Sequence, residues 1–100
     1  MTDLEIAKGS YGIVYRIWYK DVDYSTLTPL LYVWRGNNTI IDGATCDVSL
    51  VGNDTRISYL VPQGAFDVDA GVYNAKIKFV SGTIVQYEER MFNWIVYDQS

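Results

Sequence analysis

Apolar and polar residues alternate with a period of two along most of this chain, between short segments rich in Gly, Asn, Asp and Ser. Such alternation is typical of β-strands that bury one face, and no window has the i, i+3, i+4, i+7 spacing of an amphipathic helix. The pattern predicts seven or eight short strands. They are LEIA, YGIVYRIWYK, LLYVWR, TIID, ATCDVSLV, TRISYLV, VYNAKIKF and IVQYEERMFNWIVY.

Strands of this length, with a turn every 8 to 12 residues or so, indicate an all-β domain. We expect one immunoglobulin-like antiparallel β-sandwich over residues 1–100, and a small closed barrel is the alternative. GNN and DG are read as turns on either side of TIID. The final run is too long for one flat strand, so we expect a bulge or bend near residues 88–90.

The alternation also predicts which side chains face the core. In the strand after Gly71, Tyr73, Ala75, Ile77 and Phe79 share one face, and Asn74, Lys76 and Lys78 share the other. One face of this strand is therefore expected to be buried and the other to be exposed to solvent. The predicted core residues are Trp34, Tyr59, Ile77 and Phe79, with Trp34 placed on the third strand, where such sandwiches often bury a Trp.

The segment VDAGVY indicates a corner between strands. In immunoglobulin-like sandwiches a Tyr near the start of a late strand turns its hydroxyl back to a main-chain group of the preceding corner. Asp69, Gly71 and Tyr73 fit this arrangement, with Gly71 supplying backbone freedom and the Asp69 carboxylate bracing the turn. The alternative is an ordinary Asp-Gly turn ahead of a core Tyr.

Composition narrows the class of function. Twelve acidic residues against eight basic ones give a net charge of −4, which disfavours nucleic acid and anionic lipid. There is no His, and Cys46 is the only Cys, so no intrachain disulfide can form. We expect no signal segment, because Asp3 and Glu5 stand near the start, and no stretch reaches the roughly 18 apolar residues of a membrane span. The expected place of synthesis is the cytosol.

The chain offers little that resembles catalytic or metal-binding chemistry. Two DVD triplets, at residues 21–23 and 67–69, carry carboxylates suited to calcium, but the topology places these loops at opposite ends of a sandwich. Glu88, Glu89 and Asp98 form no recognisable glycosidase pair. Cys46 is expected to be a small buried side chain rather than a nucleophile. We therefore predict no enzyme activity, no metal and no cofactor.

Nine Tyr, three Trp and three Phe are more aromatic residues than one core face obviously needs. Exposed aromatics mark protein interfaces or sugar-stacking platforms, and a protein interface is preferred here because sugar sites also need polar groups clustered near the ring. The open edges of the first and the last predicted strands offer a second means of association. The candidate interface residues are Trp18, Tyr24, Tyr87 and Tyr97.

Four segments carry a family resemblance: DLEIAKGSYGIVYRIWYKD, LTPLLYVWR, TRISYLVPQGAFDVDAGVYNAKIKF and FNWIVYD. Together they resemble the immunoglobulin-like N-terminal domain of tailed-phage baseplate upper proteins. Ser10, Pro29 and Arg56 depart from that pattern.

The resemblance implies a non-enzymatic virion module of a phage tail or baseplate, made in the host cytoplasm. It would assemble with other phage structural proteins and with copies of itself. A capsid decoration or head-fibre protein is the alternative, and a carbohydrate- or receptor-binding module is an alternative of another class.

Overall fold

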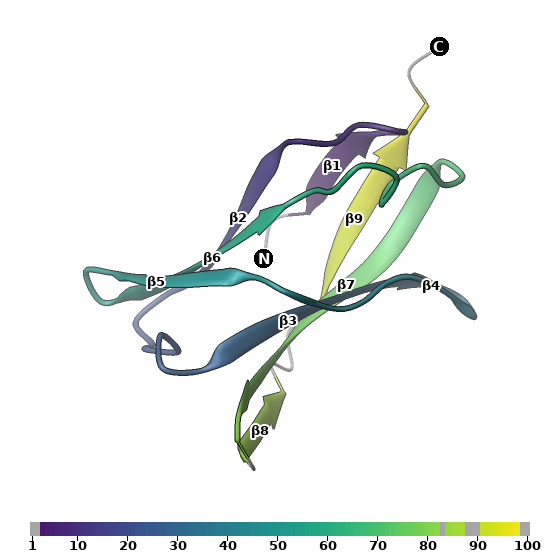
Figure 1. The fold of residues 1–100 in the computed structure, drawn as a ribbon. Coiled ribbons are helices and arrows are strands. Elements are labelled where there is room, and N and C mark those ends of the chain that lie inside the picture. Colours follow the sequence, from purple (N-terminus) through teal and green to yellow (C-terminus); the bar gives the residue numbers. More distant parts are fainter. Residues whose placement is uncertain (1–2, 83, 88–90, 99–100) are drawn as a thin grey trace.

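The computed structural model describes residues 3–82, 84–87 and 91–98, and within them the chain forms nine strands and no helix (Figure 1). The strands are β1 (Leu4–Ala7), β2 (Val14–Tyr19), β3 (Thr28–Arg35), β4 (Asn38–Thr45), β5 (Asp47–Val51), β6 (Asp54–Leu60), β7 (Gly71–Ser81), β8 (Ile84–Tyr87) and β9 (Phe92–Tyr97).

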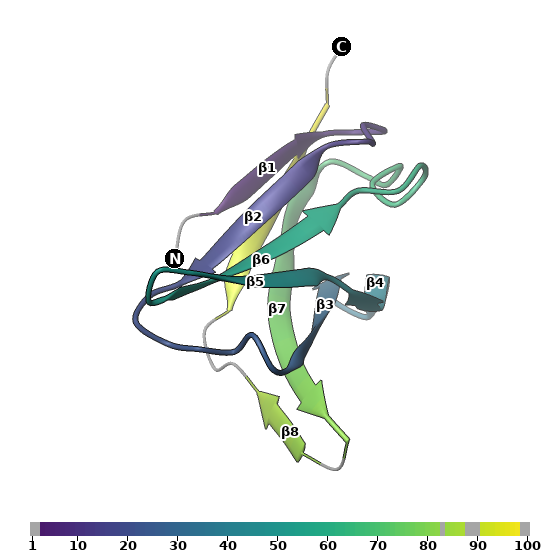
Figure 2. The same cartoon turned by 60° about the vertical axis from the view of Figure 1, so that its left-hand side comes forward.

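The strands form two sheets that pack face to face around one core (Figure 2). The larger sheet has the order β1-β9-β7-β3-β4, with β8 paired to the far end of β7, and the smaller sheet has the order β2-β6-β5. All pairs are antiparallel except β1 with β9. This arrangement is an all-β sandwich, as predicted, but it has nine strands in the described residues rather than seven or eight, and one parallel pair that the alternation could not reveal.

Two boundaries differ from the predicted ones. The Asp42-Gly43 pair does not turn the chain but lies inside β4. The strand then ends at Thr45, and the chain crosses to the smaller sheet at Cys46, whose N–H donates to the Pro29 carbonyl at 3.0 Å. The long final run divides into β8 and β9, and the predicted bend at 88–90 lies outside the described residues.

The core is built from the alternate residues that face inward from both sheets, and Tyr59, Ile77 and Phe79 are buried in it as predicted. The prediction for Trp34 is wrong. Pro29, Leu31 and Val33 are the buried residues of β3, and Trp34 is half-buried on the opposite, outer face. The buried Trp is Trp94 of β9, which has no exposed surface and is surrounded by aromatic rings from β2, β6 and the β6–β7 loop.

The corner before β7 has the geometry that the VDAGVY segment suggested. The Tyr73 hydroxyl donates to the main-chain carbonyl of Asp69 at 2.7 Å, so Asp69 takes part through its carbonyl rather than its carboxylate. Arg35 lies over the Tyr73 ring and donates to the Ala70 carbonyl at 3.2 Å. Gly71 has φ +154°, a conformation that residues with a Cβ rarely adopt, and a Cβ there would have to displace the Arg35 guanidinium, whose Nη1 would lie 2.6 Å away.

Replacing Tyr73 by Phe tests the corner. Because the Tyr73 ring is buried, the change removes one hydrogen bond and leaves the Asp69 carbonyl without that donor, so the free energy of unfolding should fall by about 1 kcal/mol. Urea titration measures this loss as a lower midpoint with an unchanged slope. Tyr11→Phe, at an exposed Tyr outside the corner, is the control and should leave the midpoint in place.

Candidate functional site

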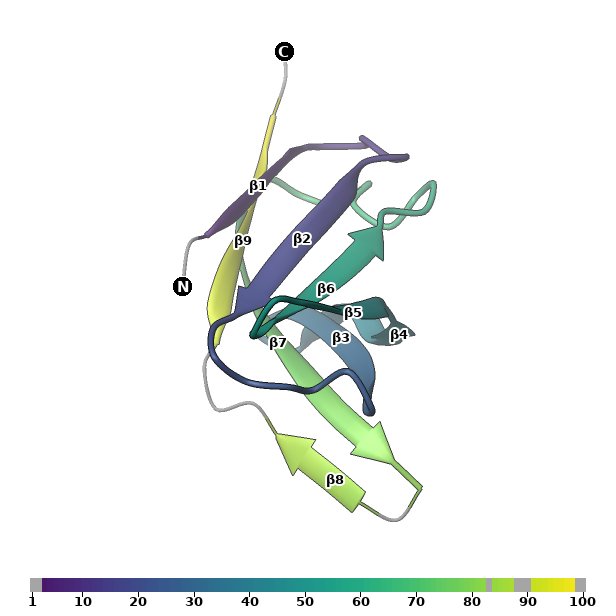
Figure 3. The ribbon, with the colours of Figure 1, turned by 90° about the vertical axis from the view of Figure 1, so that its left-hand side faces the viewer.

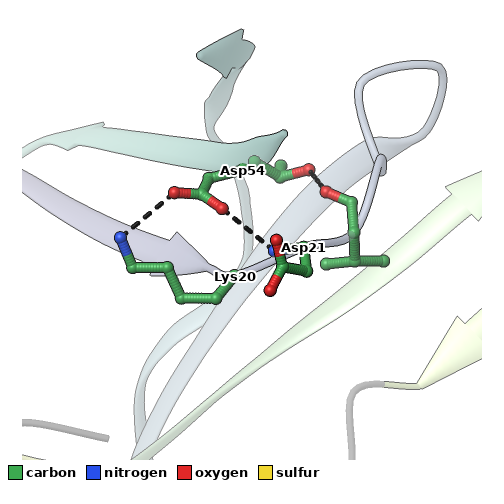
Figure 4. A network of polar contacts seen from close by, with 5 residues as sticks. Lys20, Asp21 and Asp54 are labelled. Carbon is green, nitrogen blue, oxygen red and sulfur yellow. Dashed lines mark hydrogen bonds and ion pairs between the residues drawn. The ribbon is translucent and has the colours of Figure 1, made fainter. Parts of the chain in front are cut away.

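A polar network ties the β2–β3 loop to the start of β6 (Figure 4). The Asp54 carboxylate accepts from the Asp21 main-chain N–H at 2.9 Å and from Lys20 Nζ at 3.1 Å. The bond from Asp21, followed by the bond from Lys20, lowers the pKa of Asp54 below its usual value. Asp21 has φ +54°, a conformation that costs a residue with a Cβ, so the network has the structural task of holding this loop.

The Asp54 network should make stability depend on pH. A carboxylate whose pKa is lower in the folded than in the unfolded chain stabilises above its unfolded pKa and loses this effect as pH falls through the folded pKa. The stability difference between the wild type and Asp54→Ala should therefore be full at pH 7 and shrink below about pH 4. Urea midpoints across pH measure it. Asp67→Ala, which removes an exposed loop carboxylate, is the control. A stability difference between the wild type and Asp54→Ala that does not change with pH would contradict the assignment.

The remaining candidates for chemistry do not come together. The aspartates of the two DVD triplets lie in loops at opposite ends of the sandwich (Figure 2), and no group of three metal-ligating side chains occurs in the described part of the chain. Glu88 and Glu89 lie outside the described residues. Cys46 is buried, and burial, with the Asp47 charge as a second cause, raises the pKa of its thiol to about 12. Such a thiol is a packing group rather than a nucleophile.

The four predicted interface residues lie in different environments. Tyr24 is half-buried, and its ring centroid is 4.3 Å from that of Phe79, so part of its side chain packs against the core. Trp18 and Tyr97 are 39% and 48% exposed. Tyr87 belongs to β8, whose side chains lie outside the described part of the structure.

Trp18 lies on the outer face of the smaller sheet, together with residues that the sequence patterns did not single out. Its register partner on β6 is Arg56, and the Arg56 and Lys20 cations lie 6.0 and 5.5 Å from its ring. Further along the same face, Val14 and Leu60 are direct register partners. The end of the β1–β2 loop is joined here to the residue that follows β6: the Gly12 N–H donates to the Val61 carbonyl, and the Val61 N–H donates to the Ile13 carbonyl.

This end of the smaller sheet exposes large apolar side chains, which we call the loop-end patch. Its members are Tyr11 at 56%, Ile13 at 42%, Val14 at 46% and Leu60 at 61% exposure. The β1–β2 and β6–β7 loops project side by side at this end (Figure 3), and the Gly9 N–H donates to the Phe66 carbonyl at 3.0 Å. Neighbouring exposed apolar residues of this size are typical of contact surfaces between proteins.

The outer face of the larger sheet carries the Trp that was expected inside. On this face, Tyr32 and Trp34 of β3 have Lys76 of β7 on one side, and Thr39 and Asp42 of β4 on the other. These five residues line a hollow of about 190 Å³. The sequence pattern missed this group because LLYVWR is apolar on both faces, which leaves the choice of face open. The wet side of β7, marked by Asn74, Lys76 and Lys78, was the available signal, since paired strands share their outer face.

The open edges also differ from the prediction. β9 lies between β1 and β7 and is therefore not an edge strand. β1 is an edge, and the Tyr15 hydroxyl from β2 donates to its Glu5 carbonyl at 2.6 Å, which occupies one acceptor of that edge. Strand addition at β1 is thus partly blocked, and side-chain surfaces are the stronger candidates for binding.

No helix in the described residues is long and apolar enough to cross a membrane. A scan against protein-family models and a search of curated proteins found no match to this chain.

Proposed function

We propose that this chain is a non-enzymatic structural module that binds other proteins, and first of all further copies of itself, through the loop end of its smaller sheet. The observation that carries the proposal is the loop-end patch, in which four large apolar side chains from two neighbouring segments are 42–61% exposed. Burying such side chains against a partner removes apolar surface from water, which is the main favourable term in association.

The composition of this face agrees with a protein contact. Tyr and Trp are enriched at protein interfaces, and charged residues are depleted at interface centres. The four patch members are uncharged, while Arg16 and Arg56 stand further along the outer face of the sheet, on which Val14 and Leu60 also lie. An acidic chain that associates with itself gains from an uncharged contact centre, because charge repulsion between copies is then smallest at the contact.

The resemblance to the immunoglobulin-like domain of phage baseplate upper proteins supports a more specific proposal, a tail or baseplate protein that assembles with other virion proteins. A capsid decoration protein would use the same kind of surface. Immunogold labelling of particles with antibodies to this chain tests the location: label at the tail supports the first assignment, and label over the head supports the second.

The molar mass of the purified chain, measured by light scattering over a dilution series, tests self-association. We expect a mass above that of one chain at high concentration, and Leu60→Glu should shift the protein to monomer because it places a charge in the contact. Val72→Glu, at an apolar residue of similar exposure on β7, is the matched control and should leave the mass unchanged. A wild type that is monomeric at every concentration would overturn self-association.

A further inference from the structure

The hollow on the outer face of the larger sheet is separate from the loop-end patch, because it lies on the other sheet. We call it the bulge hollow and define it by its lining, which comes from three strands: Tyr32 and Trp34 of β3, Thr39 and Asp42 of β4, and Lys76 of β7. The register sets two rows across the sheet. One row is Asp42–Tyr32–Lys76 and the other is Thr39–Trp34–Asn74–Asn93.

Two irregularities in β4 build the hollow. Trp34 pairs with Thr39 and Tyr32 pairs with Asp42, so partners two residues apart on β3 are three residues apart on β4, and the register shifts again beside Leu31. In a regular strand residues 39 and 42 would face opposite sides. The shift brings Thr39 and Asp42 to the same face, while Ile41 between them is buried.

Gly43 makes room for the Tyr32 side chain. It has φ +77°, and a Cβ there would lie 3.3 Å from the Tyr32 hydroxyl oxygen, so a side chain at this position would press on the ring. The Asp-Gly pair that resembles a turn in the sequence is therefore a glycine bulge beside the Tyr32 ring, which lines the hollow. Bulges of this kind commonly re-aim side chains beside binding sites.

We propose that the bulge hollow binds a saccharide, with one sugar ring stacked on Trp34 or Tyr32. The lining combines two aromatic rings with a carboxylate, a hydroxyl and an ammonium group, and Lys76 Nζ lies 5.7 and 5.6 Å from the Tyr32 and Trp34 ring centroids. A pyranose presents polarised C–H groups on its faces and hydroxyls around its rim. The C–H groups complement the negative face of an aromatic ring, and the hydroxyls both donate and accept.

The size and the surroundings of the hollow favour this ligand over others. Its volume of about 190 Å³ is below the roughly 300–1,000 Å³ of sites for drug-sized ligands, so it suits a single ring. Asp42 beside the rings and a net charge of −4 disfavour a nucleotide. Asn74 and Asn93 continue the Trp34 row across β7 and β9, and their amides offer hydrogen bonds to a second sugar of a longer chain.

NMR titration tests the site, with D-glucose, D-galactose, D-mannose, N-acetylglucosamine and L-rhamnose as soluble probes and a printed glycan array for longer chains. We expect at least one sugar to shift the Trp34 indole N–H and the amides of Asp42 and Lys76, with an affinity in the roughly millimolar range of a single-ring contact. Trp34→Ala should weaken binding at least tenfold, and Trp34→Phe should weaken it less, because a ring remains.

Trp18→Ala is the control and should leave sugar binding unchanged, because Trp18 lies on the other sheet. Asp42→Ala, at an exposed side chain, tests the polar rim without touching a ring and should also weaken binding. The proposal would be overturned if no soluble sugar and no glycan on the array bound to the protein. It would also be overturned if Trp34→Ala bound the sugar as tightly as the wild type does. If the NMR signals of the hollow shifted with protein concentration and not with added sugar, the hollow would be a contact site for a second copy of the chain. None of these outcomes affects the test of the loop-end patch.

Discussion

Trp94→Ala should lower the free energy of unfolding by about 3–5 kcal/mol, the range for removing a fully buried Trp. The Trp94 side chain has no exposed surface. Its ring centroid lies 4.9 Å from Tyr15 and 4.8 Å from Phe66, so the substitution would leave a large cavity between the two sheets. Since a domain of this size is stable by about 5–15 kcal/mol, the variant should lose a large part of its stability.

The matched comparison is Trp34→Ala, which removes the same type of side chain from the outer face of β3, which is separated from β9 by β7 in the same sheet. That change should cost about 1 kcal/mol or less, mainly through lost contact with Lys76. Urea midpoints of both variants measure the difference. If Trp94→Ala does not fold, Trp94→Phe supplies a variant that does. Its free energy of unfolding should lie between those of the wild type and Trp94→Ala. Equal losses at Trp94 and Trp34 would contradict the assignment of the two faces.

The Cys46 thiol should be almost unreactive in the folded protein. Burial raises its pKa to about 12, with Asp47 as the second cause, so the thiolate population at pH 8 is about a thousandfold lower than for an ordinary Cys. The Cys46 residue is only 6% exposed, which limits access as well. Labelling should therefore require opening of the sandwich where the chain crosses between sheets.

Iodoacetamide labelling at pH 8, followed by mass spectrometry, measures this protection. We expect a native rate lower by a factor of at least roughly a thousand than that of the same protein in concentrated urea, where the thiol is exposed and its pKa is ordinary. Trp94→Ala should restore part of the rate, because it raises the population of open molecules. Rapid labelling of the native wild type would contradict the burial of Cys46.

The two proposed surfaces divide the molecule between its sheets. The smaller sheet exposes apolar side chains suited to a protein contact, and the larger sheet holds a mixed aromatic and polar hollow suited to a small ligand. A module that is fixed in an assembly through one sheet would leave the other free for its ligand. The two proposals stand on different residues, so each survives failure of the other.

Local patterns in the sequence determined much of this fold. Period-two alternation predicts strands because successive side chains of a strand point to opposite faces, and it correctly buries Tyr59, Ile77 and Phe79. The corner at Tyr73 was predictable because its hydrogen bond joins residues four apart in the chain. The pattern that indicates the corner is therefore contained in one short segment. The absence of a disulfide followed from the single Cys.

Only the tertiary structure decided what depends on pairing between distant strands. LLYVWR alternates two apolar faces, and it is the pairing of β3 with β7 that buries Leu31 and Val33 and turns Trp34 outward. Asp42-Gly43 has the composition of a turn, and it is the register with β3 that makes it a bulge and brings Thr39 and Asp42 together. A short segment carries its own periodicity, but the neighbour that covers one of its faces is chosen by the packing of the whole chain.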